Sequence, residues 1–319
     1  MKRIVISIAA GSLLAALALA QSPRRGYSTI DRSGGRKVSD SAASAGHDTP
    51  AASRSLLVYV VTNDPQTGAA GFGAVDLGSG DFLPIGSGLP QDLGHALVPQ
   101  PGTSFLSMAF SGNLYAIDPR KGEASLVGAT GLGDCSTPAS PCGPNSAVTL
   151  GRLNNSYYAL DFSQNFYSVD PATGAAKLIG PTGIPPITAA PGSIDPSNGK
   201  LNLYDETLFS FRGKLYATFD TAQFDFSNGS EVAVIPAALY QIDPGTGAAT
   251  KIAPITPNDV GNLTVMNVND TIYAFNTAHL QFVTLDPATG HTEAVSSFDP
   301  ANGMVCGATA AHPGPSDQP

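Results

Sequence analysis

Three polar residues stand at matching places in the sequence, each just before an apolar stretch typical of a β-strand. They are Asn145, Glu206 and Asn262. If those stretches are the innermost strands of successive repeats, the three side chains converge on one channel. A carboxylate with amide oxygens suits a hard cation such as Ca²⁺. The sequence therefore predicts a candidate metal site, while Asn and Glu are also ordinary residues at turns.

Carboxylates near Glu206 indicate a second kind of chemistry. Paired with Asp205 or Asp259, Glu206 would supply the two acidic side chains that glycoside hydrolysis needs. The sequence contains no Gly-x-Ser-x-Gly nucleophile elbow and no His-Glu-x-x-His metal motif. We therefore assign no catalytic residue from the sequence.

An insertion at residues 223–229 places two aromatic rings among polar groups. Phe224 and Phe226 flank Asp225. Aromatic faces beside carboxylates suit sugar rings, which stack while their hydroxyls form hydrogen bonds. These three residues, with Asp205 and Asp259, are the candidate ligand-binding residues. The alternative is that both phenylalanines fold inward and hold the insertion in place.

A repeat that occurs five times supplies the elements that must position these side chains. Each copy has an apolar run, an Asp, and a Gly four residues later, as in LYQIDPGTG at residues 239–247. The run is typical of a strand, and Asp-Pro-x-Thr-Gly is typical of a hairpin loop whose Gly takes a left-handed conformation. The Asp and Gly columns are Asp76, Asp118, Asp170, Asp243 and Asp286, and Gly80, Gly122, Gly174, Gly247 and Gly290. A turn role explains these aspartates better than catalysis or metal binding.

Two further strands precede each copy, so each unit has four. Four strands per unit predict an all-β fold, a five-bladed β-propeller of antiparallel blades, with six blades as the alternative. The first unit lacks its innermost strand, and residues 304–308 form an orphan strand at the other end of the chain. Pairing that orphan inside the first blade would close the ring and remove both exposed edges.

The predicted topology separates two faces. The Asp-Pro-x-Thr-Gly turns lie on one face, the bottom, while the long connections 128–145, 181–206 and 220–237 lie on the other, the top. Long loops on a rigid scaffold commonly carry binding sites. The top connections hold Asp64, Asp92, Asp134, Asp161, Asp195, Asp205, Glu206, Asp220, Asp225, Glu231, Asp259 and Asp299, against Lys200. We therefore expect an acidic top face.

The motif LYxIDPxTGxxxxIGxTG resembles that of exported bacterial β-propeller repeat proteins, many of unassigned function. This resemblance covers nearly all of the repeat region and implies the architecture without an activity. The polar residues predicted at the channel mouth also resemble the metal site of gluconolactonase-type propellers. That second resemblance implies a metal that polarises a lactone carbonyl, although those proteins have six blades and another repeat.

The ends of the chain differ from the repeat region. Lys2 and Arg3 precede an apolar run and a small-residue cleavage site, so residues 1–20 are typical of a secretory signal. Residues 21–54 and 312–319 are poor in large apolar side chains and predict a disordered linker and tail, which leaves 55–311 for the propeller. The sequence thus predicts a secreted or periplasmic protein.

Cysteine and charge set further expectations. Cys135 and Cys142 are the first and last residues of the Pro-rich octapeptide CSTPASPC, and export makes a disulfide between them plausible. From residue 55 onward the chain has eight basic and twenty-two acidic residues. That balance disfavours nucleic acid and anionic membranes as partners. We expect a monomer.

The sequence therefore favours a non-catalytic module that binds a protein or a carbohydrate through its top face. A Ca²⁺-dependent, lactonase-like hydrolase and a glycosidase are the alternatives.

Overall fold

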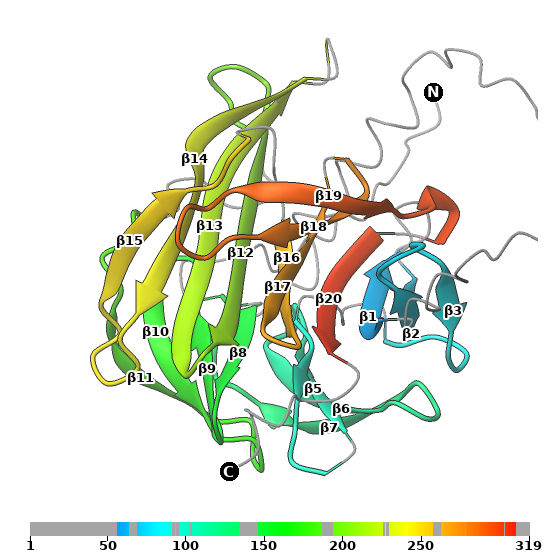
Figure 1. The fold of residues 1–319 in the computed structure, drawn as a ribbon. Coiled ribbons are helices and arrows are strands. Elements are labelled where there is room, and N and C mark those ends of the chain that lie inside the picture. Colours follow the sequence, from blue (N-terminus) through cyan, green and yellow to red (C-terminus); the bar gives the residue numbers. More distant parts are fainter. Residues whose placement is uncertain are drawn as a thin grey trace, which may run out of the picture.

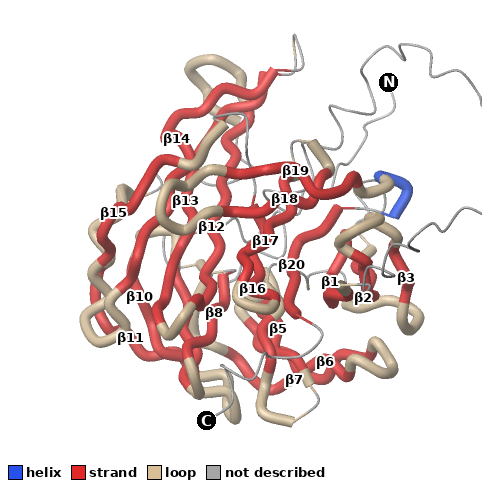
Figure 2. The backbone as a smooth tube through the Cα atoms, in the orientation of Figure 1, coloured by secondary structure: helices blue, strands red, loops and turns tan. Residues whose placement is uncertain are grey.

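The computed structural model describes residues 56–63, 69–90, 93, 96–102, 104–133, 146–147, 149–186, 194–225, 227, 230–257, 263–277, 279–302 and 304–310. Their strands form five sheets of four antiparallel strands, arranged as the blades of a β-propeller (Figure 1). Apart from the 3-10 helix η1 (Pro300–Asn302), this part of the chain has no helix (Figure 2). It therefore contains no helix with the length and apolar character needed to cross a membrane. The predicted five-bladed propeller is confirmed.

Each blade runs from an innermost to an outermost strand. Blade 1 contains β20 (Met304–Ala310), β1 (Leu57–Asn63), β2 (Ala70–Asp76) and β3 (Phe82–Pro84). Blade 2 contains β4 (Val98–Pro99), β5 (Phe105–Met108), β6 (Asn113–Asp118) and β7 (Glu123–Ala129). Blade 3 contains β8 (Thr149–Leu153), β9 (Ser156–Leu160), β10 (Asn165–Val169) and β11 (Ala176–Pro181). Blade 4 contains β12 (Leu201–Phe211), β13 (Lys214–Asp225), β14 (Ser230–Ile242) and β15 (Ala249–Pro254), and blade 5 contains β16 (Leu263–Val268), β17 (Thr271–Asn276), β18 (Gln281–Leu285) and β19 (Thr292–Ser297).

The last strand closes the ring as the sequence predicts. β20 pairs antiparallel with β1, from Val58 opposite Ala310 to Asn63 opposite Met304. The two ends of the described chain therefore share one blade, and each supplies an edge that the other covers.

The repeated Asp and Gly residues form the turns between the two outer strands of each blade. In blade 3, the Asp170 carboxylate accepts the N–H of Ala172 at 2.9 Å and the Thr173 hydroxyl at 2.8 Å. Gly174 has a φ of 82° and donates its N–H to the Asp170 carbonyl at 2.8 Å. The carboxylates of Asp76, Asp118, Asp243 and Asp286 accept the corresponding N–H in their own blades. The predicted turn role of the five aspartates is confirmed.

The same glycine of each turn touches the preceding blade. A Cβ atom built on Gly174 would lie 2.8 Å from the carbonyl oxygen of Gly128, and one built on Gly128 would lie 2.1 Å from the carbonyl oxygen of Thr173. Comparable Cβ contacts, at 2.0–3.0 Å, would arise at Gly80, Gly122, Gly247 and Gly290. Only hydrogen fits at that distance, so the repeated glycine sets how closely adjacent blades pack.

Buried side chains fill the space between blades. Blades 5 and 1 share a cluster that includes Phe275, Phe282, Phe298, Val60 and Val305. Within it, the rings of Phe275 and Phe282 lie 5.2 Å apart and are tilted by 58°. Apolar faces of strands that alternate inward and outward thus make a continuous core around the axis.

Blade 4 extends beyond the other four at the top of the view in Figure 1. The connections 181–206 and 220–237 were predicted to be loops. This is wrong for residues 201–206, 220–225 and 230–237, which belong to β12, β13 and β14. We call this extension, residues 201–206, 219–225 and 230–237, the tongue. Alternating side chains explain it: Leu201, Leu203, Ala222 and Phe224 face one side and form a small core of their own. The extra strand length lengthens one blade and adds no sixth blade.

The contact between turn glycines and the preceding blade can be tested apart from backbone strain. Gly128→Ala introduces the Cβ contact at a residue outside the left-handed region, and we expect a loss of roughly 2 kcal/mol or more in the free energy of unfolding. Gly213→Ala is the control, because Gly213 has a φ of 72° but no atom within 4 Å of its Cβ position. Strain alone there should cost about 1 kcal/mol. Urea unfolding measures both, and equal losses would contradict the packing role.

Candidate functional site

The structure describes four of the predicted site residues. Glu206 and Asp205 lie in β12, and Phe224 and Asp225 lie in β13. The other predicted residues lie outside the described part of the chain: Asn145, Asn262, Phe226, Asp259, Cys135 and Cys142. The metal set and the disulfide therefore stay predictions, with Glu206 as the one described member of the metal set.

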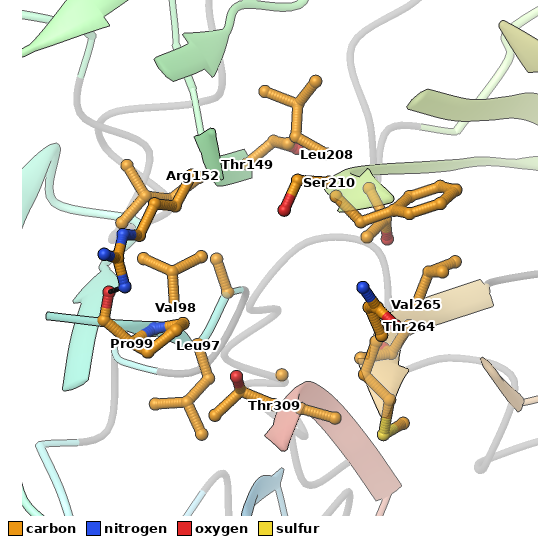
Figure 3. Close-up of a pocket in the computed structure, with 18 of the residues that line it drawn as sticks. Leu97, Val98, Pro99, Thr149, Arg152, Leu208, Ser210, Thr264, Val265 and Thr309 are labelled. Carbon is orange, nitrogen blue, oxygen red and sulfur yellow. Dashed lines mark hydrogen bonds between the residues drawn. The ribbon is translucent and has the colours of Figure 1, made fainter. Parts of the chain in front are cut away.

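A cavity lies on the propeller axis, between the innermost strands of all five blades (Figure 3). Its volume is about 90 Å³. Since a water molecule needs roughly 15 Å³ of such space, the cavity has room for about six waters. The cavity is thus smaller than the roughly 300–1,000 Å³ typical of small-molecule sites.

Polar groups line the cavity, and one of them is a cation. Figure 3 shows the hydroxyl groups of Ser210 and Thr309 directed into the open space, with Arg152 at its side. The Arg152 guanidinium donates to the carbonyl oxygen of Pro99 at 3.2 Å and stacks 5.9 Å from the centre of the Tyr157 ring. Because Pro99 belongs to blade 2 and Arg152 to blade 3, this side chain joins two blades along the cavity wall.

Threonines near the upper ends of three innermost strands bond to the next blade. Thr149 donates its hydroxyl to the carbonyl of Glu206 at 3.0 Å, and Thr207 donates to that of Leu263 at 2.6 Å. Thr264 likewise donates its hydroxyl to the carbonyl of Val305 in blade 1, at 3.4 Å. The main chain of Glu206 is therefore fixed by the blade before it.

The side chain of Glu206 is buried, with 6 % of the residue exposed. Its Oε2 atom accepts from Nε2 of Gln164 at 3.3 Å, and its Oε1 atom has no hydrogen-bond partner. Burial raises the pKa of Glu206 well above its ordinary value, and the nearby Asp161 charge adds to this, while the Gln164 hydrogen bond opposes it. The carboxyl group is thus held where its charged form is disfavoured.

Asp161 lies beside this pair and is fully buried. It accepts the backbone N–H of Asn165 at 2.8 Å, the Asn165 side-chain amide at 3.0 Å and the Tyr167 hydroxyl at 2.8 Å. Burial together with the hydrogen bond to Asp161 raises the pKa of Tyr167 to about 12, so this phenol stays protonated and keeps donating. Asp161 and Glu206 therefore place two carboxyl groups in one buried region.

Asp205 lies on the other side of the same strand. Neighbouring residues of a β-strand point to opposite faces, so Asp205 and Glu206 do not face each other. The Asp205 carboxylate instead accepts the backbone N–H of Leu263 in blade 5. A glycosidase pair that joins these two residues therefore has no support in the geometry.

Phe224 and Asp225 have separate roles in the tongue. Phe224 is 4 % exposed and packs in the small core of the tongue, so its ring is not open to a sugar. Asp225 accepts the N–H and hydroxyl of Ser227 at 2.9 and 2.6 Å and pairs with Lys200 at 3.8 Å. The Ser227 hydrogen bonds, with a smaller effect of Lys200, lower the pKa of Asp225. Its carboxylate thus stabilises the tip of the β13–β14 hairpin.

A polar network covers the face of the tongue opposite its small core. The Gln223 amide donates to Asp195 at 2.9 Å and to Asn202 at 3.0 Å, and it accepts from Asn198 at 3.0 Å. These bonds tie the turn before β12 to the tongue. The extension is therefore held on both faces.

The upper half of β14 is an open edge. β15 pairs only with Ala238–Ile242, so residues 230–236 have strand pairing on the β13 side alone within the described chain. Val232 and Val234 on this edge are 52 % and 58 % exposed. An exposed strand edge with aliphatic side chains is a template for another chain.

From the sequence, Asp161 was counted only among the acidic residues of the top face, and Gln164 was not singled out. Both lie in the turn between β9 and β10, and Gln164 has a φ of 64°, where the same turn has Gly112 in blade 2 and Leu280 in blade 5. The signal available in the sequence was a Gln at the turn position that Gly112 occupies in blade 2. No group of three or more His, Cys, Asp or Glu that could hold a metal occurs among the described residues.

Comparisons with solved structures find remote similarity. A chain from a nidogen–laminin complex is 9 % identical, with a TM-score of 0.44 over 81 % of this chain and 98 % of that one. The PQQ-bound aldose sugar dehydrogenase of Streptomyces coelicolor is 10 % identical, with a TM-score of 0.40 over 72 % and 87 %. BamB of Moraxella catarrhalis is 17 % identical, with a TM-score of 0.30 over 73 % and 62 %. No protein-family model and no curated protein matches the sequence, so the comparisons assign no function.

Burial of Glu206 predicts a pH dependence of stability. Its raised pKa means that the folded state binds more protons than the unfolded state above about pH 4.3, so this residue lowers stability as pH rises through that range. In a chelating buffer, Glu206→Gln should therefore be more stable than the parent protein at pH 8, by at least about 1 kcal/mol, and should lose that advantage near pH 4.

Thermal unfolding from pH 4 to 8 measures this difference. Glu123→Gln is the matched control, since its side chain is 74 % exposed in an ion pair with Lys121 and should leave the profile unchanged. A Glu206→Gln profile parallel to that of the parent protein would contradict the buried carboxyl group.

Proposed function

We propose that this chain is an exported binding module that holds a protein partner on its top face, with the tongue of blade 4 as the main contact. The open edge of β14 with Val232 and Val234 is the observation that carries this proposal. A partner segment in extended conformation would add a strand at residues 230–235 and place side chains against the two valines. Pro236, which has no N–H to donate, ends that edge.

The construction of the tongue supports a recognition role. Its core side chains are buried and its opposite face is a closed hydrogen-bond network, so it is ordered before any partner arrives. An element ordered in advance loses less conformational entropy on binding. Among the residues that the structure describes, no other blade has an extension of this length.

The accessible surfaces favour a protein over a carbohydrate. Phe224 is inside the tongue, and the axial cavity is small. The exposed groups on β14 are main-chain atoms and aliphatic side chains, which suit a peptide strand better than a sugar. The described carboxyl groups do not assemble an accessible acid–base pair, which gives the glycosidase alternative less support.

Residues 1–20 support export, and with it a partner in the periplasm or outside the cell. The acidic excess after residue 55 favours a neutral or basic partner.

Charged substitutions on the open edge test the proposal. Val232→Glu with Val234→Glu should abolish capture of the partner from periplasmic or secreted fractions, because carboxylates block strand addition and desolvation of the edge. We expect at least about a hundredfold loss in affinity for the captured protein, measured by surface plasmon resonance.

Val295→Glu is the control, since Val295 is an exposed aliphatic residue, 39 % exposed, on the outer strand of blade 5. It should bind like the parent protein. Equal binding by all three proteins, or capture of nothing by the parent protein, would refute a tongue-mediated function.

A further inference from the structure

Two buried side-chain oxygen atoms without partners lie in one hydrogen-bonded pair of residues. Among the described residues, six buried side-chain atoms lack a hydrogen bond: Asn63 Oδ1, Ser107 Oγ, Gln164 Oε1, Glu206 Oε1, Thr218 Oγ1 and Asn267 Oδ1. Gln164 and Glu206 are also bonded to each other, so their two free oxygens belong to one cluster. A buried acceptor without a donor destabilises the folded state, so two in neighbouring side chains indicate a missing partner.

The Gln164 side chain extends from a turn residue with a left-handed backbone conformation. Its φ of 64° is unusual for a residue other than glycine. The main chain is held there, because the Gln164 carbonyl accepts both the N–H and the hydroxyl of Thr182 at 2.9 Å. The amide, 1 % exposed, reaches from blade 3 to Glu206 of blade 4.

The cluster has negative charge and no compensating side chain. Asp161 is fully buried beside Glu206 and already accepts three hydrogen bonds. The ion pairs of the described residues are Lys121–Glu123, Lys200–Asp225 and His291–Glu293, none of which involves Asp161 or Glu206. Removing an unpaired carboxylate from water costs several kcal/mol, so a proton or a cation has to neutralise this cluster.

The available ligand atoms select the kind of cation. They are carboxylate and amide oxygens, with no Cys or His among them, which excludes the usual zinc ligand sets and fits a hard cation. Rotation of the Gln164 amide by 180° would bring its free Oε1 next to Glu206. Ca²⁺ accepts such mixed and irregular oxygen sets and completes its shell with water.

We propose that Glu206, Gln164 and Asp161 form a Ca²⁺ site between blades 3 and 4, at the root of the tongue. This site differs from the one predicted from sequence, since two of its three members come from the β9–β10 turn. It goes beyond the proposed partner binding and does not depend on it. The cation would replace the missing donors of both free oxygens and join the two blades.

Terbium luminescence tests the site directly. The chain has no Trp and ten Tyr, and Tyr167 donates to Asp161, so Tb³⁺ bound here would be excited through tyrosine. We expect tyrosine-sensitised Tb³⁺ emission from the purified parent protein, displaced by Ca²⁺, together with a rise of about 4 °C in melting temperature at about 1 mM Ca²⁺ relative to chelator.

Three variants assign the signal to the cluster. Glu206→Gln should abolish the Ca²⁺-dependent emission and the thermal shift, while Glu123→Gln, on the exposed surface, should retain both. Gln164→Leu should weaken Ca²⁺ binding at least about tenfold without unfolding the protein. Leucine is tolerated at this backbone geometry, because Leu280 occupies the same turn position with a φ of 51°.

Two results would overturn the proposal. The first is emission that Glu206→Gln leaves intact, which would place the ion on other acidic residues. The second is a parent protein that neither binds Tb³⁺ nor gains stability with Ca²⁺, which would assign a proton to Glu206.

Discussion

The fit of a turn glycine against the outer strand of the preceding blade is the contact that the whole ring depends on. It recurs at all five junctions, and a Cβ atom at any of the five glycines would come within 2.0–3.0 Å of its neighbour. In a closed ring, a change in the spacing at one junction between blades must be compensated at the other four. The Asp carboxylates support the same contact indirectly, since they fix the loop that presents the glycine.

That constraint explains where the blades differ from one another. The lower halves of all five blades carry the repeat and have to match in spacing, which limits insertions there. Above the ring no such limit applies, and blade 4 adds the tongue to its three inner strands without disturbing its outer turn. The part of blade 4 that differs from the other blades is thus at the top face, and it is built on strands that begin in the ring.

The sequence was sufficient for the scaffold and insufficient for the site. Five Asp–Gly columns and an orphan strand at 304–308 predicted the blades and their closure, because turn chemistry repeats at fixed spacing. Residues 201–206 and 220–237 were interpreted as loops, because they lie outside the repeat and their partners are set by tertiary pairing.

Asp161 and Gln164 show a different limit of the sequence. Each looks like an ordinary turn residue, and only the packing of blade 3 against blade 4 brings them to Glu206. Glu206 itself was singled out as a residue just before a strand, but it lies inside β12, and its companions come from the neighbouring blade and not from the same position in other repeats.

The position of this cluster links the ring to the tongue. β12 leaves the ring at Glu206, where the Thr149 hydroxyl holds its carbonyl and Gln164 holds its side chain. Any species that neutralises the buried carboxyl groups stabilises the junction of blades 3 and 4, and with it the base from which the tongue rises. A charge left uncompensated there would loosen the same junction. The protonation or ligation of one buried carboxyl group thereby affects how stably the tongue is attached to the ring.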